Sequence, residues 1–173
     1  GATIVLFPFS NLLVRLAEIT IPDGKNKEDV QAELVSIDER FLERPAFAME
    51  LCRGKVREMA ELIRKSMGLA LEVLLNYEEE KAQEVIKMES VADKYEDVLG
   101  SYLVKLSSKN ISTTDSQSMS IILHSISDFE RISDHAENLA EYAEQVISGK
   151  AIISSKGMQE LRTLADQTME SVT

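Results

Sequence analysis

The sequence predicts an all-α fold: an antiparallel three-helix bundle followed by a truncated fourth helix. Three observations lead to this class. All three prolines lie within the first 45 residues, so long helices are permitted from Ala46 to Thr173. Apolar residues recur at steps of three and four along three successive stretches, as in helices that bury one face. Short polar segments join these stretches, which favours antiparallel neighbours.

The first apolar stripe predicts a helix of about thirty residues. Gly54 and Gly68 each lower its helix propensity by about 1 kcal/mol relative to alanine, so packing must hold this helix. Cys52 lies on the stripe and is predicted to be a small core residue. As the single cysteine it excludes an internal disulfide framework and favours a reducing compartment. The stripe consists of Met49, Cys52, Val56, Met59, Ile63, Met67, Ala70, Leu74 and Tyr77.

Two further stripes predict the second and third helices. The acidic run EEE at 78–80 suits a helix start, and SSKNIS at 107–112 ends the second helix. Thr114 and Gln117 are expected to cap the third helix, which Gly149 ends. The second stripe is Val85, Met88, Ala92, Tyr95, Leu99, Leu103 and Leu106, and the third is Ile122, Ile126, Phe129, Ala136, Ala140, Ala143 and Ile147.

These signals divide the chain into four parts. Residues 1–24 form an apolar N-terminal segment, but its continuous apolar stretch of about a dozen residues is too short to span a bilayer, which needs roughly 20. It is either a buried terminal segment or the end of a membrane helix. Residues 25–45 are expected to be a linker, in which AELVSIDERFLERP is either a short extended piece or a packed loop, and residues 46–150 the three-helix bundle. Residues 151–173 begin a further helix, starting at Ser154 or Ser155.

The charge of the chain limits its partners. A formal net charge of -11 and a pI near 4.7 argue against nucleic acid and anionic membrane surfaces. Cations or basic protein surfaces suit such a chain better. A hydrophobic content of 44% is enough to bury a substantial core.

The stretch DFERISDHAENLAEYAE at 128–144 places five carboxylates on one side of the third helix. Like charges at these spacings repel, so the row costs roughly 1–2 kcal/mol in total. A shorter row with the same spacing lies on the second helix. The long row is Glu130, Asp134, Glu137, Glu141 and Glu144, and the short row is Glu89, Asp93 and Glu96.

Antiparallel packing of the second and third helices would bring these rows alongside each other. Glu89 and Asp93 would then converge with Glu130 and Asp134. Four carboxylates in water-poor surroundings need a cation, and all-oxygen ligands favour hard ions such as magnesium, calcium, manganese or iron. Asp97 and Glu137 are weaker candidate ligands by their spacing. The alternative is a solvated acidic face without metal, because burial of the apolar stripes outweighs the repulsion.

Other site chemistries find little support in the sequence. A ferritin-like di-iron site needs Glu three residues before His, and neither His124 nor His135 has it. Both histidines are expected to face outward or toward a neighbour. No Cys-x-x-Cys pair, Gly-rich phosphate loop or Gly-x-Ser-x-Gly motif occurs. We therefore expect no catalytic residues, no organic cofactor and no enzymatic activity.

The stretches DFERISDHAENLAE and MESVADKYEDVL resemble the signature motifs of the PhoU family. The resemblance implies a three-helix repeat in which paired E(D)-x-x-x-D motifs hold clusters of iron, zinc or related ions. The matching metal ligands are Glu89, Asp93, Glu130 and Asp134, whereas His135 and Asn138 match the motif without a ligand role. Ser133 replaces the glycine common in the family, on the side of the helix near the apolar stripe.

The front of the chain resembles the junction of bacterial sodium/phosphate cotransporters, in which the last membrane helix leads into a PhoU-like tail. The residues carrying this likeness are LFPFSNLLVRLAE and IDERFLERPAFAMELCRGKVREM. The resemblance implies a regulatory domain at the cytoplasmic face of the inner membrane, with the transporter membrane domain or phosphate-signalling proteins as partners. An exposed apolar front end and an unfinished repeat also lead us to expect a homo-oligomer.

Overall fold

The computed structural model describes residues 35–171, which fold into five helices. A short 3-10 helix, η1 (Glu39–Glu43), precedes three long α-helices and a shorter one: α3 (Pro45–Leu75), α4 (Glu79–Ser107), α5 (Thr113–Ile147) and α6 (Ser155–Ser171). This part of the chain contains no β-strand, so the all-α prediction is confirmed. The apolar segment predicted over residues 1–24 lies outside the described residues.

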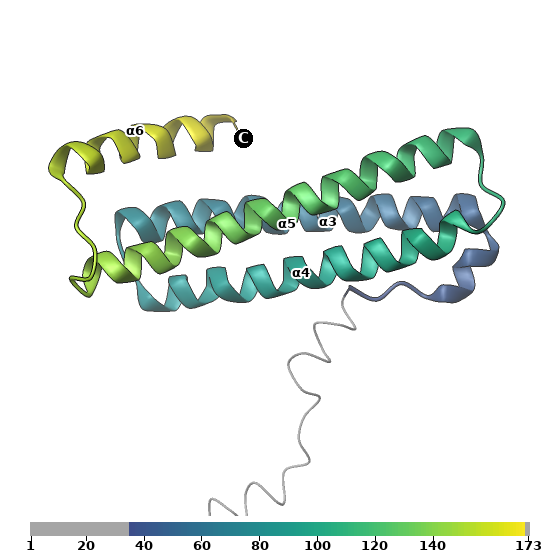
Figure 1. The fold of residues 1–173 in the computed structure, drawn as a ribbon, viewed down its shortest axis with the longest axis horizontal. Helices are drawn as coiled ribbons and strands as arrows, with labels where there is room; N and C mark the ends of the chain where they lie inside the picture. Colours follow the sequence, from purple (N-terminus) through teal and green to yellow (C-terminus); the bar gives the residue numbers. More distant parts are fainter. Residues whose placement is uncertain (1–34, 172–173) are drawn as a thin grey trace, which may run out of the picture. The chain divides into compact units, whose positions relative to one another are not determined.

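Helices α3, α4 and α5 lie side by side and contact one another along their lengths (Figure 1). The chain reverses its direction between α3 and α4 and again between α4 and α5. Side-chain contacts agree with these directions. Lys81 at the start of α4 pairs with Glu72 near the end of α3, whereas Arg53 and Asp115 pair near the starts of α3 and α5.

Residues 35–44 pack against this bundle, although the sequence predicted a linker there. Val35 and Leu42 are buried in its core. Lys105 of α4 and Lys109, just beyond the end of that helix, form ion pairs with Glu39 and Glu43, which tie η1 to this end of α4. The sequence pattern left a packed loop open as one alternative here, because two core positions in a short polar stretch are too few to establish a period.

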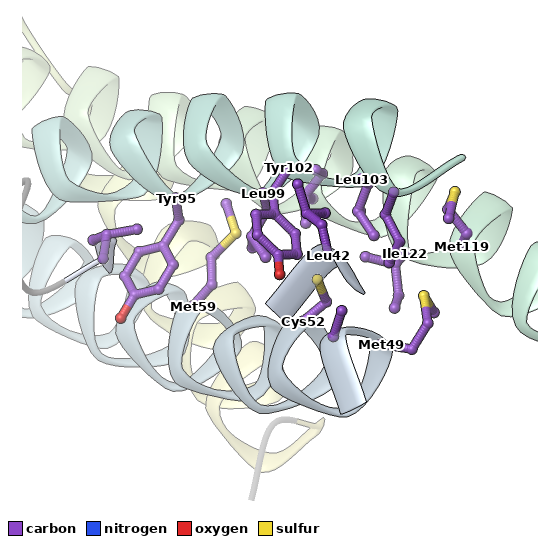
Figure 2. Packing of buried hydrophobic residues seen from close by; sticks show 14 of the residues in the cluster. Leu42, Met49, Cys52, Met59, Tyr95, Leu99, Tyr102, Leu103, Met119 and Ile122 are labelled. Atoms are coloured by element: carbon purple, nitrogen blue, oxygen red, sulfur yellow. The ribbon is translucent and has the colours of Figure 1, made fainter. Parts of the chain in front are cut away.

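Two separate hydrophobic clusters fill the interior. The first lies toward η1 and contains large side chains, several of which Figure 2 shows. The second lies toward the α3–α4 connection and is rich in alanine. Buried members of the first cluster are Val35, Leu42, Ala48, Met49, Cys52, Met59, Ile63, Ala92, Tyr95, Leu99, Tyr102, Leu103, Leu106, Met119, Ile122 and Ile126. Those of the second are Ala70, Val73, Leu74, Ala82, Val85, Ala136, Ala140 and Ala143.

One position of the third predicted stripe does not enter the core. Ile147 is 68% exposed at the last residue of α5. The chain leaves the helix directly after this residue, through the C-cap residue Ser148, so the stripe does not continue beyond Ile147.

The N-cap of α5 also differs from the predicted pair, Thr114 and Gln117. Ser112 is the cap residue, and its Oγ accepts a hydrogen bond from the backbone N–H of Asp115 at 3.0 Å. The Ser112 hydroxyl in turn donates to the Asp115 carboxylate at 2.8 Å. Ser112 is the more favourable cap because its hydroxyl makes both of these hydrogen bonds with Asp115. Asp115 also lies in the first turn of α5, where the helix dipole favours a negative charge.

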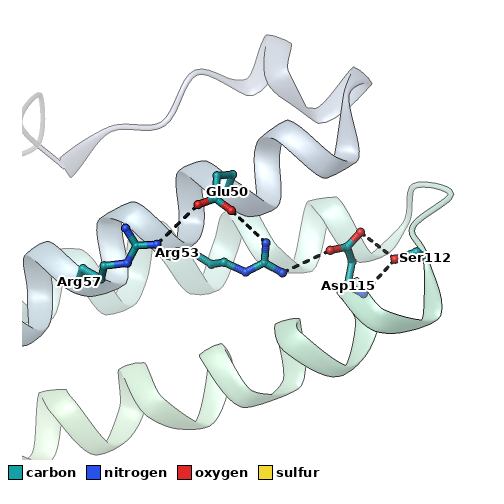
Figure 3. A network of polar contacts seen from close by, with 5 residues as sticks. All are labelled: Glu50, Arg53, Arg57, Ser112 and Asp115. Carbon is teal, nitrogen blue, oxygen red and sulfur yellow. Dashed lines mark hydrogen bonds and ion pairs between the residues drawn. The ribbon is translucent and has the colours of Figure 1, made fainter.

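Asp115 also links the beginnings of α3 and α5 (Figure 3). Arg53 contacts it at 3.4 Å and contacts Glu50 at 3.1 Å, and Arg57 reaches Glu50 at 3.6 Å. Both arginines belong to α3. Their positive charge is therefore used in part to hold α3 to α5.

Replacing Ser112 by alanine should lower the free energy of unfolding by about 1 kcal/mol, because a backbone donor at the start of α5 loses its partner. Thr114→Ala serves as the matched control. It should change stability by no more than a few tenths of a kcal/mol, because Thr114 lies within the helix and makes no cap. Urea unfolding of both variants measures the difference, and a larger loss in Thr114→Ala would contradict the observed cap.

Candidate metal centre

Three of the four carboxylates singled out in the sequence meet between α4 and α5. Glu89 and Asp93 come from successive turns of α4, and Asp134 comes from α5. One carboxylate oxygen from each lies within 4.8 Å of the others. Glu89 and Asp134 are partly buried, whereas Asp93 is exposed. The site is thus a partly exposed cluster of carboxylates between α4 and α5.

The fourth carboxylate, Glu130, lies next to this trio without joining it. Partial burial raises the pKa of Glu130, and the negative charges of Asp134, Glu96 and Asp93 raise it further. Glu96 itself accepts a hydrogen bond from Ser127 Oγ at 2.7 Å. Glu130, one turn before Asp134 on α5, is therefore close enough for the neighbouring carboxylates to raise its pKa. It is not among the residues whose oxygens lie within 4.8 Å of one another.

Of the two weaker candidates, the structure brings only one near the trio. Burial raises the pKa of Glu137, as do the charges of Glu141, Asp134 and Asp93. Asp97 is exposed and lines a different groove, beside Tyr102 and Lys105. Asp97 lies four residues after Asp93 and therefore on the same face of α4. It is one turn further along the helix, however, and so lies farther from Asp134.

Glu89 shows the electrostatic consequence most clearly. Burial raises the pKa of Glu89 to about 7, and the charges of Asp93, Glu137 and Asp134 contribute to this rise. Near neutral pH this carboxyl therefore holds a proton about half of the time. The proton is the simplest way to reduce repulsion within the trio, and a cation would do the same more completely.

The residues present suit a hard cation. All three donors are carboxylate oxygens, the ligands preferred by magnesium, manganese and iron ions. The donors are close enough together for one ion to contact more than one of them, and they come from two helices. Arg131 offsets the charge of Glu130 only weakly, because it also pairs with Asp128 at 3.9 Å.

The cysteine and the two histidines are the side chains that could suggest catalysis, but none of them is part of the carboxylate cluster. Cys52 is fully buried in the first cluster, and burial raises the pKa of its thiol to about 11. His124 and His135 are exposed on α5. The ring Nδ1 of His124 lies 2.7 Å from the carbonyl oxygen of Ser120, within its own helix. The core role predicted for Cys52 is confirmed.

Two buried serines form a feature that the sequence did not reveal. Ser66 of α3 and Ser133 of α5 are 0% and 1% exposed, and neither hydroxyl has a hydrogen-bond partner among the described residues. The sequence drew attention to Ser133 as a departure from the family motif. The absence of a partner depends on all three helices together, so no local pattern could predict it.

These observations define an all-helical bundle protein with a carboxylate cluster on one edge and no catalytic constellation among the described residues. The model of the PhoU domain matches residues 56–143, a range that includes the whole cluster, and the chain therefore belongs to the PhoU family. PhoU domains are linked to phosphate regulation, and the family is regulatory and non-enzymatic. Comparisons with curated proteins and with solved structures find no match.

Proposed function

We propose that the chain is a non-enzymatic, metal-binding regulatory domain that modulates phosphate transport or phosphate signalling. The approach of Glu89, Asp93 and Asp134 to within 4.8 Å carries this proposal. Membership of the PhoU family supports the phosphate-related part. In this proposal the domain is an antiparallel three-helix repeat of the PhoU kind, followed by α6.

Glu89, Asp93 and Asp134 would hold the ion, with Glu130 as the fourth carboxylate of the same face. The bound ion supplies concentrated positive charge, and iron, zinc, manganese and magnesium are the candidates. The all-oxygen donor set favours the harder ions among them. Glu89 must give up its proton for the ion to bind, so affinity should increase as the pH rises through about 7.

The ion would act by joining α4 to α5. Without it, repulsion between the facing carboxylates weakens the contact of the two helices at their shared edge. With it, the same side chains attract a common partner and hold the helices together. A surface that depends on the position of α4 or α5 would then report ion occupancy to a partner protein.

The proposed setting is the cytosolic tail of a sodium/phosphate cotransporter, at the cytoplasmic face of the inner membrane. The junction-like sequence at the front of the chain supports this setting. Among the described residues, no helix is long and apolar enough to cross a membrane. The partners would be the transporter membrane domain or phosphate-signalling proteins, together with further copies of the chain, and solution mass measured by light scattering tests the homo-oligomer.

Elemental analysis of the purified protein tests metal binding. We expect Asp134→Asn and Glu89→Gln to lower the bound metal per chain at least tenfold after dialysis, because each removes a charged ligand from a set of three. Glu84→Gln is the matched control, because Glu84 is an exposed acid of α4 outside the cluster. Unchanged metal content in both cluster variants would remove these residues from the site.

A metal-free interaction module is the second candidate function. The exposure of Asp93 favours it, because a solvated carboxylate tolerates neighbouring charge without an ion. In that case the acidic edge would serve as a docking surface for a basic partner. The two functions predict different responses of thermal stability to added cation: a rise for the metal-binding domain and no change for the metal-free module.

A further inference from the structure

The boundary between the two hydrophobic clusters coincides with the buried, unpartnered hydroxyls. On α3 the first cluster ends at Ile63 and the second begins at Ala70, with Ser66 between them. On α5 the first cluster ends at Ile126 and the second begins at Ala136, with Ser133 between them. Both residues are at least 99% buried, and neither hydroxyl has a hydrogen-bond partner within the described part of the chain.

The helix register places these serines at the level of the carboxylate trio. Ser127 contacts Glu96, and two turns further along the antiparallel pair Asp134 lies opposite Glu89. Ser133 therefore adjoins the trio in sequence and in height. The position of Ser66 follows from a contact between α3 and α4, in which Tyr95 donates to Glu58. Two turns from that contact, Met88 of α4 lies opposite the turn of α3 that contains Ser66, so Ser66 is level with Glu89.

A buried hydroxyl without a partner destabilises the part of the core around it. Its hydrogen bonds with water are lost on folding, and no hydrogen bond within the protein replaces them. Other serines of the bundle avoid this loss. Ser125 of α5, for example, donates to the carbonyl oxygen of Ile121 at 3.0 Å. The two buried serines thus interrupt the hydrophobic core. They separate the half of the bundle that contains the first cluster, with its large side chains, from the half that contains the alanine-rich second cluster.

We propose that Ser66 and Ser133 form a seam that allows the alanine-rich half of the bundle to open separately from the other half. This half contains the second cluster, against which Leu161 of α6 packs. Opening would therefore also release α6. A cation held by Glu89, Asp93 and Asp134 would lie at the same level along the bundle as the seam. If the proposed function holds, this cation couples the two halves and suppresses the opening.

Amide hydrogen exchange of the full chain in the presence of a chelator tests the seam itself. We expect amides of the second half, such as those of Val73, Val85 and Ala140, to exchange about tenfold faster than the slowest amides of the first half. Met59, Leu99 and Ile126 provide that reference. Equal protection of the two halves would overturn the inference.

The double variant Ser66→Ala, Ser133→Ala tests the cause. Alanine fills nearly the same space without a hydroxyl, so protection of the second half should rise about threefold or more while the first half changes little. Ser125→Ala is the matched control and should not raise protection of the second half. Lower protection in the double variant would mean that the hydroxyls have partners, for example internal water, and would overturn the inference.

Adding Mn²⁺ alone tests the coupling. Protection of the second half should approach that of the first as the site fills, with binding followed separately by the electron paramagnetic resonance signal of free Mn²⁺. Binding of Mn²⁺ without a rise in protection would overturn the coupling but leave the proposed metal site standing. Failure of Mn²⁺ to bind would overturn the proposed function, and the serine variants would still decide whether the seam exists.

Discussion

Leu99→Ala is expected to lower the free energy of unfolding by about 2–5 kcal/mol, as for other fully buried leucines. Leu99 of α4 is 0% exposed within the first cluster, where Met59 and Tyr102 also contribute large side chains (Figure 2). Removing it takes away apolar contacts and leaves a cavity that the surrounding helices fill only in part. For a domain of this size such a loss is a large fraction of the total stability.

Val104→Ala is the matched control on the same helix, because Val104 is 64% exposed. Its effect should stay within about 0.5 kcal/mol. Urea unfolding followed by circular dichroism measures both variants. Similar effects of the two substitutions would mean that the first cluster is not the main stabilising core of the bundle.

The metal-free protein is expected to lose stability as the pH rises from about 4.5 to above 7. The pKa of Glu89 is raised from its ordinary value of 4.5 to about 7. Its contribution is therefore fully present below pH 4.5 and is lost as the pH rises through 7. Partial burial raises the pKa of Glu130 and Glu137 as well, so both act in the same direction.

Glu89→Gln isolates this effect, because glutamine resembles the protonated carboxyl and carries no charge. In the presence of a chelator, the variant should be more stable than the wild type by about 1–2 kcal/mol at pH 8, a value reduced for solvent screening, and nearly equal to it at pH 4.5. Urea unfolding across this pH range measures the difference. Glu84→Gln should retain the wild-type slope, and a Glu89→Gln variant that also retains it would contradict the assigned pKa.

Periodicity predicted most of the helical structure because each long helix buries one continuous face. The stripes led directly to the cores of α3, α4 and α5, and the glycine at 149 marked the end of α5, where its φ is 74°. The fourth helix begins at Ser155, with Ser154 Oγ accepting from the N–H of Gly157 at 3.0 Å. The cap of α5 was predicted two residues too late, because Ser, Thr and Asp all cap well and occur together there.

The candidate site could be predicted in part for the same reason. Spacing places Glu89 and Asp93 on one face of α4 whatever the helix contacts, and Asp134 follows from antiparallel packing. The separate position of Glu130 depends on the exact register of α4 against α5, which side-chain packing sets. The unpartnered hydroxyls of Ser66 and Ser133 depend on three helices at once and could not be read from any one of them.

Thermal unfolding during titration with Mn²⁺ examines most directly whether Glu89, Asp93 and Asp134 together hold a cation. For the chelator-treated wild type at pH 8, we expect the Tm to rise with Mn²⁺, corresponding to about 2.7 kcal/mol when the ion reaches a hundred times its Kd. Glu89→Gln and Asp134→Asn should show little or no rise. A wild-type Tm that is independent of Mn²⁺, combined with a higher Tm for Glu89→Gln, would instead identify the acidic edge as metal-free.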